Sequence, residues 1–195
     1  VDHVIVQPLD GELSEGVVVV PGLSASWNTK AMVLDQEVDQ SEWKLIPFAK
    51  PVYQRLYHAL EQNGYTTGED LFLWPYDWRQ PISESADDLA FFIENTDGLK
   101  TKDKINLIGH SLGGMVSRQW AKDNQNKVGK IVTVGSPHQG AVQAYQALAG
   151  GKIGEQRDLE WIGMELLVHI NRRGFQTDAA VIQNFAPVLY DLTPS

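Results

Sequence analysis

Four short apolar runs rich in β-branched residues alternate with helical segments along this chain. The runs are Val17–Val20, Leu71–Trp74, Ile105–Ile108 and Ile131–Val134. A run that is apolar without alternation is typical of a strand buried on both faces, as in a parallel sheet. Because helices follow the strands, the pattern predicts right-handed crossovers and an α/β fold with a mostly parallel, doubly wound sheet.

The helical segments are recognised by their periodicity and by their ends. Val52, Leu56 and Leu60 recur every four residues, which places them on one apolar face. Ser83 is a candidate N-cap for the segment that follows it. We expect helices over residues 49–63, 83–94, 112–123 and 139–149.

The alternation of strands and helices ends at residue 152. Residues 153–186 contain an amphipathic helical stretch and no buried strand. We therefore expect one domain over residues 1–195, with a sheet-bearing core over 1–152 and a helical lid in 153–195.

Composition excludes several function classes. The 195 residues carry a formal net charge of −9, and phosphate binding needs clustered Lys and Arg, so no nucleic-acid partner is expected. Cysteine is absent, which removes disulfides, thiolate nucleophiles and most structural zinc sites. No apolar run reaches the roughly 20 residues that span a bilayer. We expect no metal and no cofactor.

A serine stands between two glycines in the stretch Gly109-His110-Ser111-Leu112-Gly113. A strand, then Gly-x-Ser-x-Gly, then an amphipathic helix is the pattern of a nucleophile elbow, in which a sharp turn projects the serine hydroxyl above the sheet. Ser111 is the candidate nucleophile. The alternative is an ordinary strand-to-helix turn with a serine cap.

A second loop supplies candidates for binding an oxyanion. The run Val17–Val20 ends in Pro21-Gly22-Leu23, upstream of the elbow, where such enzymes draw one backbone donor. We expect the N–H groups of Leu23 and Leu112 to be the two donors.

Two further segments follow strands. Residues 74–81 read WPYDWRQP and lie where open α/β sheets bind ligands. Trp74, Tyr76 and Trp78 are candidates to line an acyl or lipid site, and Asp77 and Arg79 can form an ion pair that holds the loop. The alternative is a packed loop with a structural salt bridge. Residues 135–140 read GSPHQG, and His138 there is expected near the site but not as the general base, which in this architecture follows the last strand.

The combination of PGLSASW at 21–27, LFLWPYDWRQ at 71–80, GHSLGG at 109–114 and GSPHQG at 135–140 resembles α/β-hydrolases related to lecithin:cholesterol acyltransferase. The resemblance implies an α/β-hydrolase fold and acyl-ester chemistry through a Ser-Asp-His triad. It also implies that Ser111 is the nucleophile, that Leu23 and Leu112 supply the oxyanion N–H groups, and that Tyr76, Asp77, Trp78 and Arg79 border the active site. From its position, His138 is expected as a further substrate-binding residue.

The acid and histidine of the triad are not found in this sequence. Past Ser111 the histidines are His138 and His169, and neither follows an acidic residue at the end of a successive strand. The family carries both groups after the lid. We therefore expect the enzyme to continue past residue 195, and these residues alone to be weakly active at most.

The leading hypothesis is a serine esterase, lipase or lipid acyltransferase that forms an acyl-enzyme on Ser111. The alternatives are a non-catalytic lipid- or surface-binding module with the same fold, and a serine hydrolase of other specificity such as a thioesterase or peptidase. The expected partner is a lipid or other ester, with transient contact to a membrane surface. The family resemblance favours a secreted or extracytoplasmic location.

Overall fold

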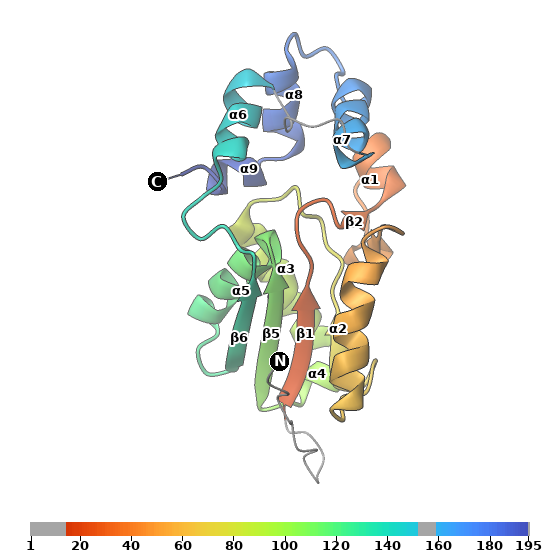
Figure 1. The fold of residues 1–195 in the computed structure, drawn as a ribbon, viewed down its shortest axis with the longest axis vertical. Coiled ribbons are helices and arrows are strands. Elements are labelled where there is room, and N and C mark those ends of the chain that lie inside the picture. The colour runs from red at the N-terminus through yellow and green to blue at the C-terminus, as the bar shows by residue number, and fades with distance from the viewer. Residues whose placement is uncertain (1–14, 152–158, 195) are drawn as a thin grey trace, which may run out of the picture.

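The computed structural model describes residues 15–151 and 159–194. Its main sheet has the order β4-β1-β5-β6, and every neighbouring pair is parallel. The strands are β1 (Glu15–Val20), β4 (Leu71–Leu73), β5 (Lys104–His110) and β6 (Val128–Val134) (Figure 1). All four predicted strands are confirmed, as is the mostly parallel α/β sheet.

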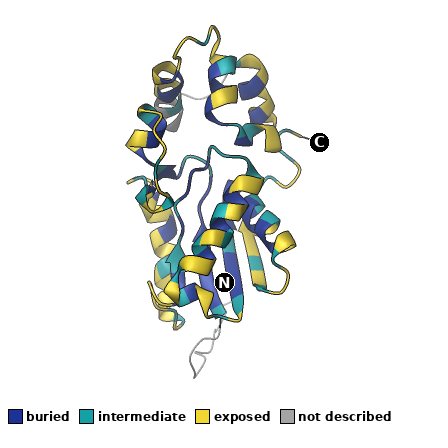
Figure 2. Ribbon diagram, turned by 180° about the vertical axis from the view of Figure 1, so that it is seen from behind, coloured by how far each residue is buried: buried dark blue, intermediate teal, exposed yellow. Residues whose placement is uncertain are grey.

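Alternate residues of β1 serve two different helical layers. Val17 and Val19 pack in a cluster with Tyr53 of α2 (Lys50–Gln62). Val18 and Val20 belong to the main core, to which α3 (Ile82–Asn95) and α5 (Leu112–Asp123) contribute. The central strand β1 is therefore covered on both faces, and Figure 2 shows the central strands of the sheet buried while exposed residues lie on the outer faces of the helices.

β6 departs from the expected burial. Val132 and Val134 are 51% and 52% exposed, although a strand buried on both faces was predicted. β6 lies at the edge of the sheet, and no described element covers the face that carries these two side chains. Ile131 packs against the main core beneath α5. The prediction is wrong for one face because an apolar run alone does not specify how many layers cover it.

The predicted helices are present with small shifts in their ends. The fourth one is α6 (Val142–Gly150), and α5 begins and ends where expected. Ser83 is not an N-cap, because α3 begins one residue earlier, after Pro81. In α2 the prediction holds for Leu56 and Leu60, which pack against the cluster with Tyr53, but it is wrong for Val52, which is 60% exposed while Tyr53 is buried.

Several short elements were not predicted. They join the strands and flank the sheet: β2 (Ser26–Trp27), α1 (Thr29–Val33), the 3-10 helix η1 (Gln40–Glu42), β3 (Lys44–Leu45) and α4 (Asp97–Lys100). Asn28 caps α1 by accepting hydrogen bonds from the N–H groups of Lys30 and Ala31. β2 and β3 pair antiparallel.

A helical layer lies beyond the carboxyl ends of the strands (Figure 1). It contains α6, α7 (Leu159–Ile170), α8 (Asp178–Phe185) and α9 (Val188–Asp191). α6 packs on α8 and α9, so it contacts helices beyond the predicted boundary at residue 152. Residues 152–158 lie outside the described part of the chain. That these helices act as a lid stays a prediction.

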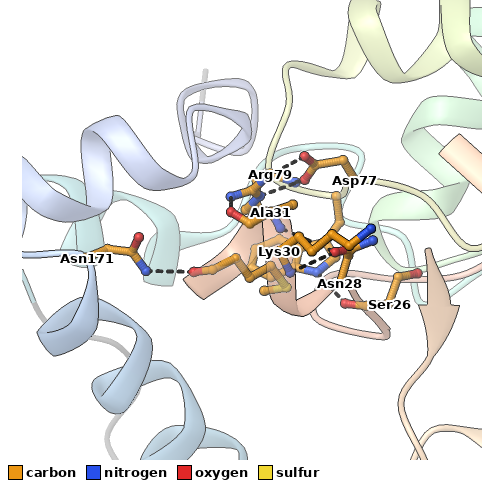
Figure 3. Close-up of polar contacts among 9 residues, drawn as sticks. Ser26, Asn28, Lys30, Ala31, Asp77, Arg79 and Asn171 are labelled. Atoms are coloured by element: carbon orange, nitrogen blue, oxygen red, sulfur yellow. Dashed lines mark hydrogen bonds and ion pairs between the residues drawn. The ribbon is translucent and has the colours of Figure 1, made fainter. Parts of the chain in front are cut away.

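Polar side chains tie the end of α7 to α1. The Asn171 amide donates to the carbonyl oxygen of Met32 at 2.9 Å, as Figure 3 shows. Arg173 donates to the carbonyl oxygen of Val33 at 2.9 Å and forms an ion pair with Asp35. In residues 15–151 and 159–194, no helix combines the length and the hydropathy that a membrane span requires.

Candidate active site

Ser111 occupies the turn between β5 and α5 in a strained backbone conformation. Its φ is 51° and its ψ is −120°, a region that side chains with a Cβ rarely adopt. Its N–H donates to the carbonyl oxygen of Val134 at 2.8 Å, which ties the turn to β6. Although Ser111 stands at the N-cap position of α5, its side chain makes no capping hydrogen bond. The alternative of a serine cap is therefore wrong, and the hydroxyl is not used by the helix.

The glycines around Ser111 allow the backbones of β5, α5 and the end of β1 to lie in close contact. A Cβ on Gly109 would lie 2.4 Å from the Cα of Gly114. A Cβ on Gly113 would lie 2.1 Å from the carbonyl oxygen of Val20. These separations are far below any real contact of a Cβ, so only glycine allows α5 to pass so close to β5 and to the end of β1.

The loop after β1 lies against the elbow. A Cβ on Gly22 would be 3.0 Å from the Cβ of Ser111, so the backbone at residue 22 adjoins the serine. The Gly22 N–H is already used, because it donates to the Tyr53 hydroxyl at 3.1 Å. The Leu23 N–H has no acceptor among the described residues. Leu112 begins α5, and a helix leaves the N–H groups of its first turn without an intrahelical acceptor. Both predicted oxyanion donors are thus available in the loop and the elbow.

The segment Tyr76–Arg79 is hydrogen-bonded to the loop after β1. The Tyr76 hydroxyl donates to the carbonyl oxygen of Pro21 at 3.2 Å, and its ring stacks on Trp74 at 4.6 Å. The Trp78 indole N–H donates to the carbonyl oxygen of Ser26 at 2.9 Å. Tyr76 and Trp78 are each 1% exposed, so their polar atoms reach the loop and not solvent. Direct substrate contact by this segment stays a prediction.

The expected ion pair between Asp77 and Arg79 is present in a two-point arrangement. Arg79 Nη2 lies 2.6 Å from Asp77 Oδ2, and Arg79 Nε lies 2.8 Å from Oδ1. A third donor, Nη1, reaches the carbonyl oxygen of Ala31 at 3.2 Å (Figure 3). The guanidinium also lies over the rings of Trp43 and Phe185. Arg79 therefore links the loop after β4 to α1 and to α8.

Breaking this pair is expected to destabilise the fold. Asp77→Ala should lower the free energy of unfolding by about 3 kcal/mol, because it leaves a desolvated guanidinium without its counter-charge. Lys30→Ala, which breaks the exposed pair with Glu42, is the matched control and should change it by about 0.5 kcal/mol or less. Urea unfolding followed by circular dichroism measures both. Equal effects of the two variants would contradict the prediction.

The described histidines are all engaged away from the Ser111 hydroxyl or exposed. His138 Nδ1 lies 3.0 Å from Arg118 Nη1, and its Nε2 lies 3.2 Å from Thr133 Oγ1. His169 lies exposed near the end of α7, and His58 bonds Gln62 along α2. No histidine in residues 15–151 or 159–194 is hydrogen-bonded to Ser111, and no cluster of metal-ligand side chains is found there. A role for His138 in substrate binding stays a prediction.

Tyr53 is the residue of this site that the sequence did not reveal. It comes from α2, and its hydroxyl lies 3.1 Å from both the Gly22 nitrogen and His110 Nδ1. His110 is half-buried and lies edge-on to the Tyr53 ring. The polar hydroxyl on a mostly apolar helical face is a weak signal, because Tyr57 on the same helix carries a buried hydroxyl too.

Comparison with known proteins places these observations in a family. The family model for lecithin:cholesterol acyltransferase matches residues 37–180. Among solved structures, the mature lipase BlEst2 of Bacillus licheniformis aligns with 95% of this chain and 61% of its own, at 18% identity and a TM-score of 0.49. The phospholipase PlaB of Legionella pneumophila, in complex with thio-NAD, aligns with 86% of this chain and 35% of its own, at 16% identity and a TM-score of 0.48.

A lipase-esterase related protein from Clostridium acetobutylicum aligns with 92% of this chain and 82% of its own, at 12% identity and a TM-score of 0.47. This chain thus spans less than two thirds of the length of the first two structures. No curated protein matches the sequence.

Proposed function

Because the chain belongs to the lecithin:cholesterol acyltransferase family of α/β-hydrolases, we propose that it carries the nucleophile of a serine esterase or acyltransferase that acts on lipid esters. The observation that carries the proposal is the strained Ser111, whose hydroxyl caps no helix and whose neighbour is the backbone at Gly22. Strain of this kind persists only where surrounding structure holds it, and it is concentrated at active sites.

The reaction is an acyl transfer in two halves. Ser111 Oγ attacks the ester carbonyl carbon while its proton passes to a general base, and the carbonyl electron pair moves onto oxygen. The N–H groups of Leu23 and Leu112 bind that oxyanion. Collapse expels the alcohol, which takes the proton from the base and leaves an acyl-enzyme. Water or a second alcohol then releases the acyl group by the reverse sequence.

The general base of this proposal lies outside the described residues. We take it to be a histidine oriented by an acidic side chain, in keeping with the family's triad. Within the described chain, both ring nitrogens of His138 have partners on α5 and β6, and His110 is occupied by Tyr53.

An apolar cavity supports the proposal that the substrate is an ester with a hydrocarbon chain. It has a volume of about 170 Å³ and opens between the loop after β1, α1 and α7. Its lining includes Ser24, Trp27, Met32, Trp78, Met164 and Leu167. Ser24 directly follows Leu23, so the cavity adjoins the proposed oxyanion donor. Phe48 and Leu166, which also line it, are 65% and 57% exposed, and such an apolar rim suits a substrate that is presented at a lipid surface.

Labelling with a fluorophosphonate tests the proposal. The full-length protein is expected to gain one phosphonyl group, located on Ser111 by peptide mass analysis, because the probe reacts only with an activated serine. If no Ser111 adduct forms under conditions that label a control lipase, the enzyme proposal is wrong and the non-catalytic lipid-binding alternative stands.

Substrate series then separate the remaining alternatives. Esters of increasing chain length, compared with matched thioesters and amides, are expected to show preference for oxygen esters with an alkyl chain. A preference for amides would identify a peptidase, and a preference for thioesters would identify a thioesterase.

A further inference from the structure

We propose that Tyr53 is a positioning residue for the acyl transfer proposed above, acting through Gly22 to hold the Leu23 N–H in place. Tyr53 does not touch the reacting atoms. The inference rests on the proposed function, and it assigns to α2 a part in the chemistry that neither the sequence pattern nor the family match gives it.

The hydroxyl of Tyr53 joins the two halves of the oxyanion site. It accepts a hydrogen bond from the Gly22 N–H at 3.1 Å, on the loop after β1. On the elbow side it lies 3.1 Å from the Nδ1 atom of His110, and His110 is the residue just before Ser111. A hydroxyl has one proton to give and lone pairs to accept, so both bonds form together when His110 carries its proton on Nε2.

The backbone of Gly22 also lies close to His110 and Ser111. A Cβ on Gly22 would lie 3.1 Å from His110 Nδ1 and 3.2 Å from the His110 carbonyl oxygen. The backbone of Gly22 therefore lies against the elbow and is held there by Tyr53. Since Leu23 is the next residue, the direction of its N–H follows from the peptide plane that Gly22 and Leu23 share.

Burial favours the neutral form of the Tyr53 hydroxyl, which these two hydrogen bonds require. Tyr53 is 5% exposed, and burial raises its pKa above the ordinary value for tyrosine. The neutral phenol can donate to His110 and accept from Gly22, whereas a phenolate can only accept.

Donors that are fixed before reaction stabilise an oxyanion without reorganisation, and losing one such donor costs about 10²–10³-fold in turnover. Removing the Tyr53 hydroxyl releases the Gly22 N–H, but the Leu23 N–H stays present and the Gly22 carbonyl oxygen of the same peptide still accepts from the Ala25 N–H at 3.3 Å. The expected loss is therefore smaller, about 10–10²-fold in kcat.

The test compares Tyr53→Phe with Tyr57→Phe in the full-length protein. Tyr57 is one helical turn further along α2, and its buried hydroxyl has no hydrogen-bond partner among the described residues. Hydrolysis of p-nitrophenyl butyrate by Tyr53→Phe should show kcat reduced about 10–10²-fold with KM within about twofold of wild type. Tyr57→Phe should match wild type in both constants.

An alkylboronic acid separates positioning from general stability. It forms a tetrahedral adduct with a serine oxygen and so imitates the oxyanion. Its affinity should fall in Tyr53→Phe by about the same factor as kcat. Unchanged kcat, or a rate that falls only with the folded fraction while boronate affinity is retained, would overturn the inference. A wild-type protein that neither hydrolyses the ester nor reacts with the fluorophosphonate would instead overturn the proposed function itself, and the inference with it.

Discussion

Ser111→Gly is expected to abolish acyl transfer and, at the same time, to make the fold more stable. Loss of a serine nucleophile costs on the order of 10⁴–10⁶-fold in kcat, because no other group can form the acyl-enzyme. Stability should rise because Ser111 has a φ of 51° and a ψ of −120°, which glycine adopts without steric cost. Strain at such a residue is worth about 1–3 kcal/mol, and the added freedom of glycine in the unfolded chain offsets part of it. We expect a net gain of about 1 kcal/mol.

Ser111→Ala is the matched control for this prediction. It removes the same hydroxyl but keeps the Cβ, so it should lose activity equally without the gain in stability. Ester hydrolysis and urea unfolding of both variants measure the two effects. A glycine variant that turns over like wild type would remove Ser111 from the mechanism, and one that is no more stable than the alanine variant would contradict the strain argument.

Gly113→Ala is expected to destabilise the protein strongly, against the usual sign for such a change in a helix. Alanine inside a helix is ordinarily better than glycine by about 0.5–1 kcal/mol. Here the new Cβ would lie 2.1 Å from the Val20 carbonyl oxygen and 2.5 Å from that of Pro21. Backbone oxygens at the end of a buried strand cannot rotate away. We expect a loss of about 3 kcal/mol, at the upper end of overpacking effects.

The activity of Gly113→Ala should also fall in the fraction that still folds. Val20 and Pro21 lead directly into Gly22 and Leu23, so pushing them from α5 displaces the proposed oxyanion donor. Lys122→Ala, at an exposed position of the same helix, should change stability by about 0.5 kcal/mol or less. Urea unfolding distinguishes the two variants. A neutral or stabilising effect of Gly113→Ala would mean that α5 and β1 are not in the close contact described above.

The elbow shows how much of a site can be predicted from local sequence. Gly109, Ser111 and Gly113 lie within five residues, and each flanking element is recognised from its own periodicity. The turn, the strand before it and the helix after it are all consequences of nearby residues. The predicted pair of Asp77 and Arg79 is of the same kind, since two positions separate the partners.

Tyr53 shows what the same reasoning misses. Its two partners are 31 and 57 positions away, and nothing in the helical pattern around it distinguishes a tyrosine that packs from one that bonds a distant loop. The predicted face of α2 holds for Leu56 and Leu60 and is wrong at its first residue. The buried position belongs to Tyr53, which can reach Gly22, and not to Val52.

By itself, the sequence determined the four parallel strands, the helices between them and the serine turn, because periodicity and glycine placement act over a few residues. Only the tertiary structure decided which groups meet around Ser111. Tyr76 and Trp78 turn inward to hold the loop after β1, Tyr53 fastens that loop to the elbow, and one face of β6 is left exposed. These outcomes depend on how separate elements pack, and packing is a property of the whole fold and not of any one segment.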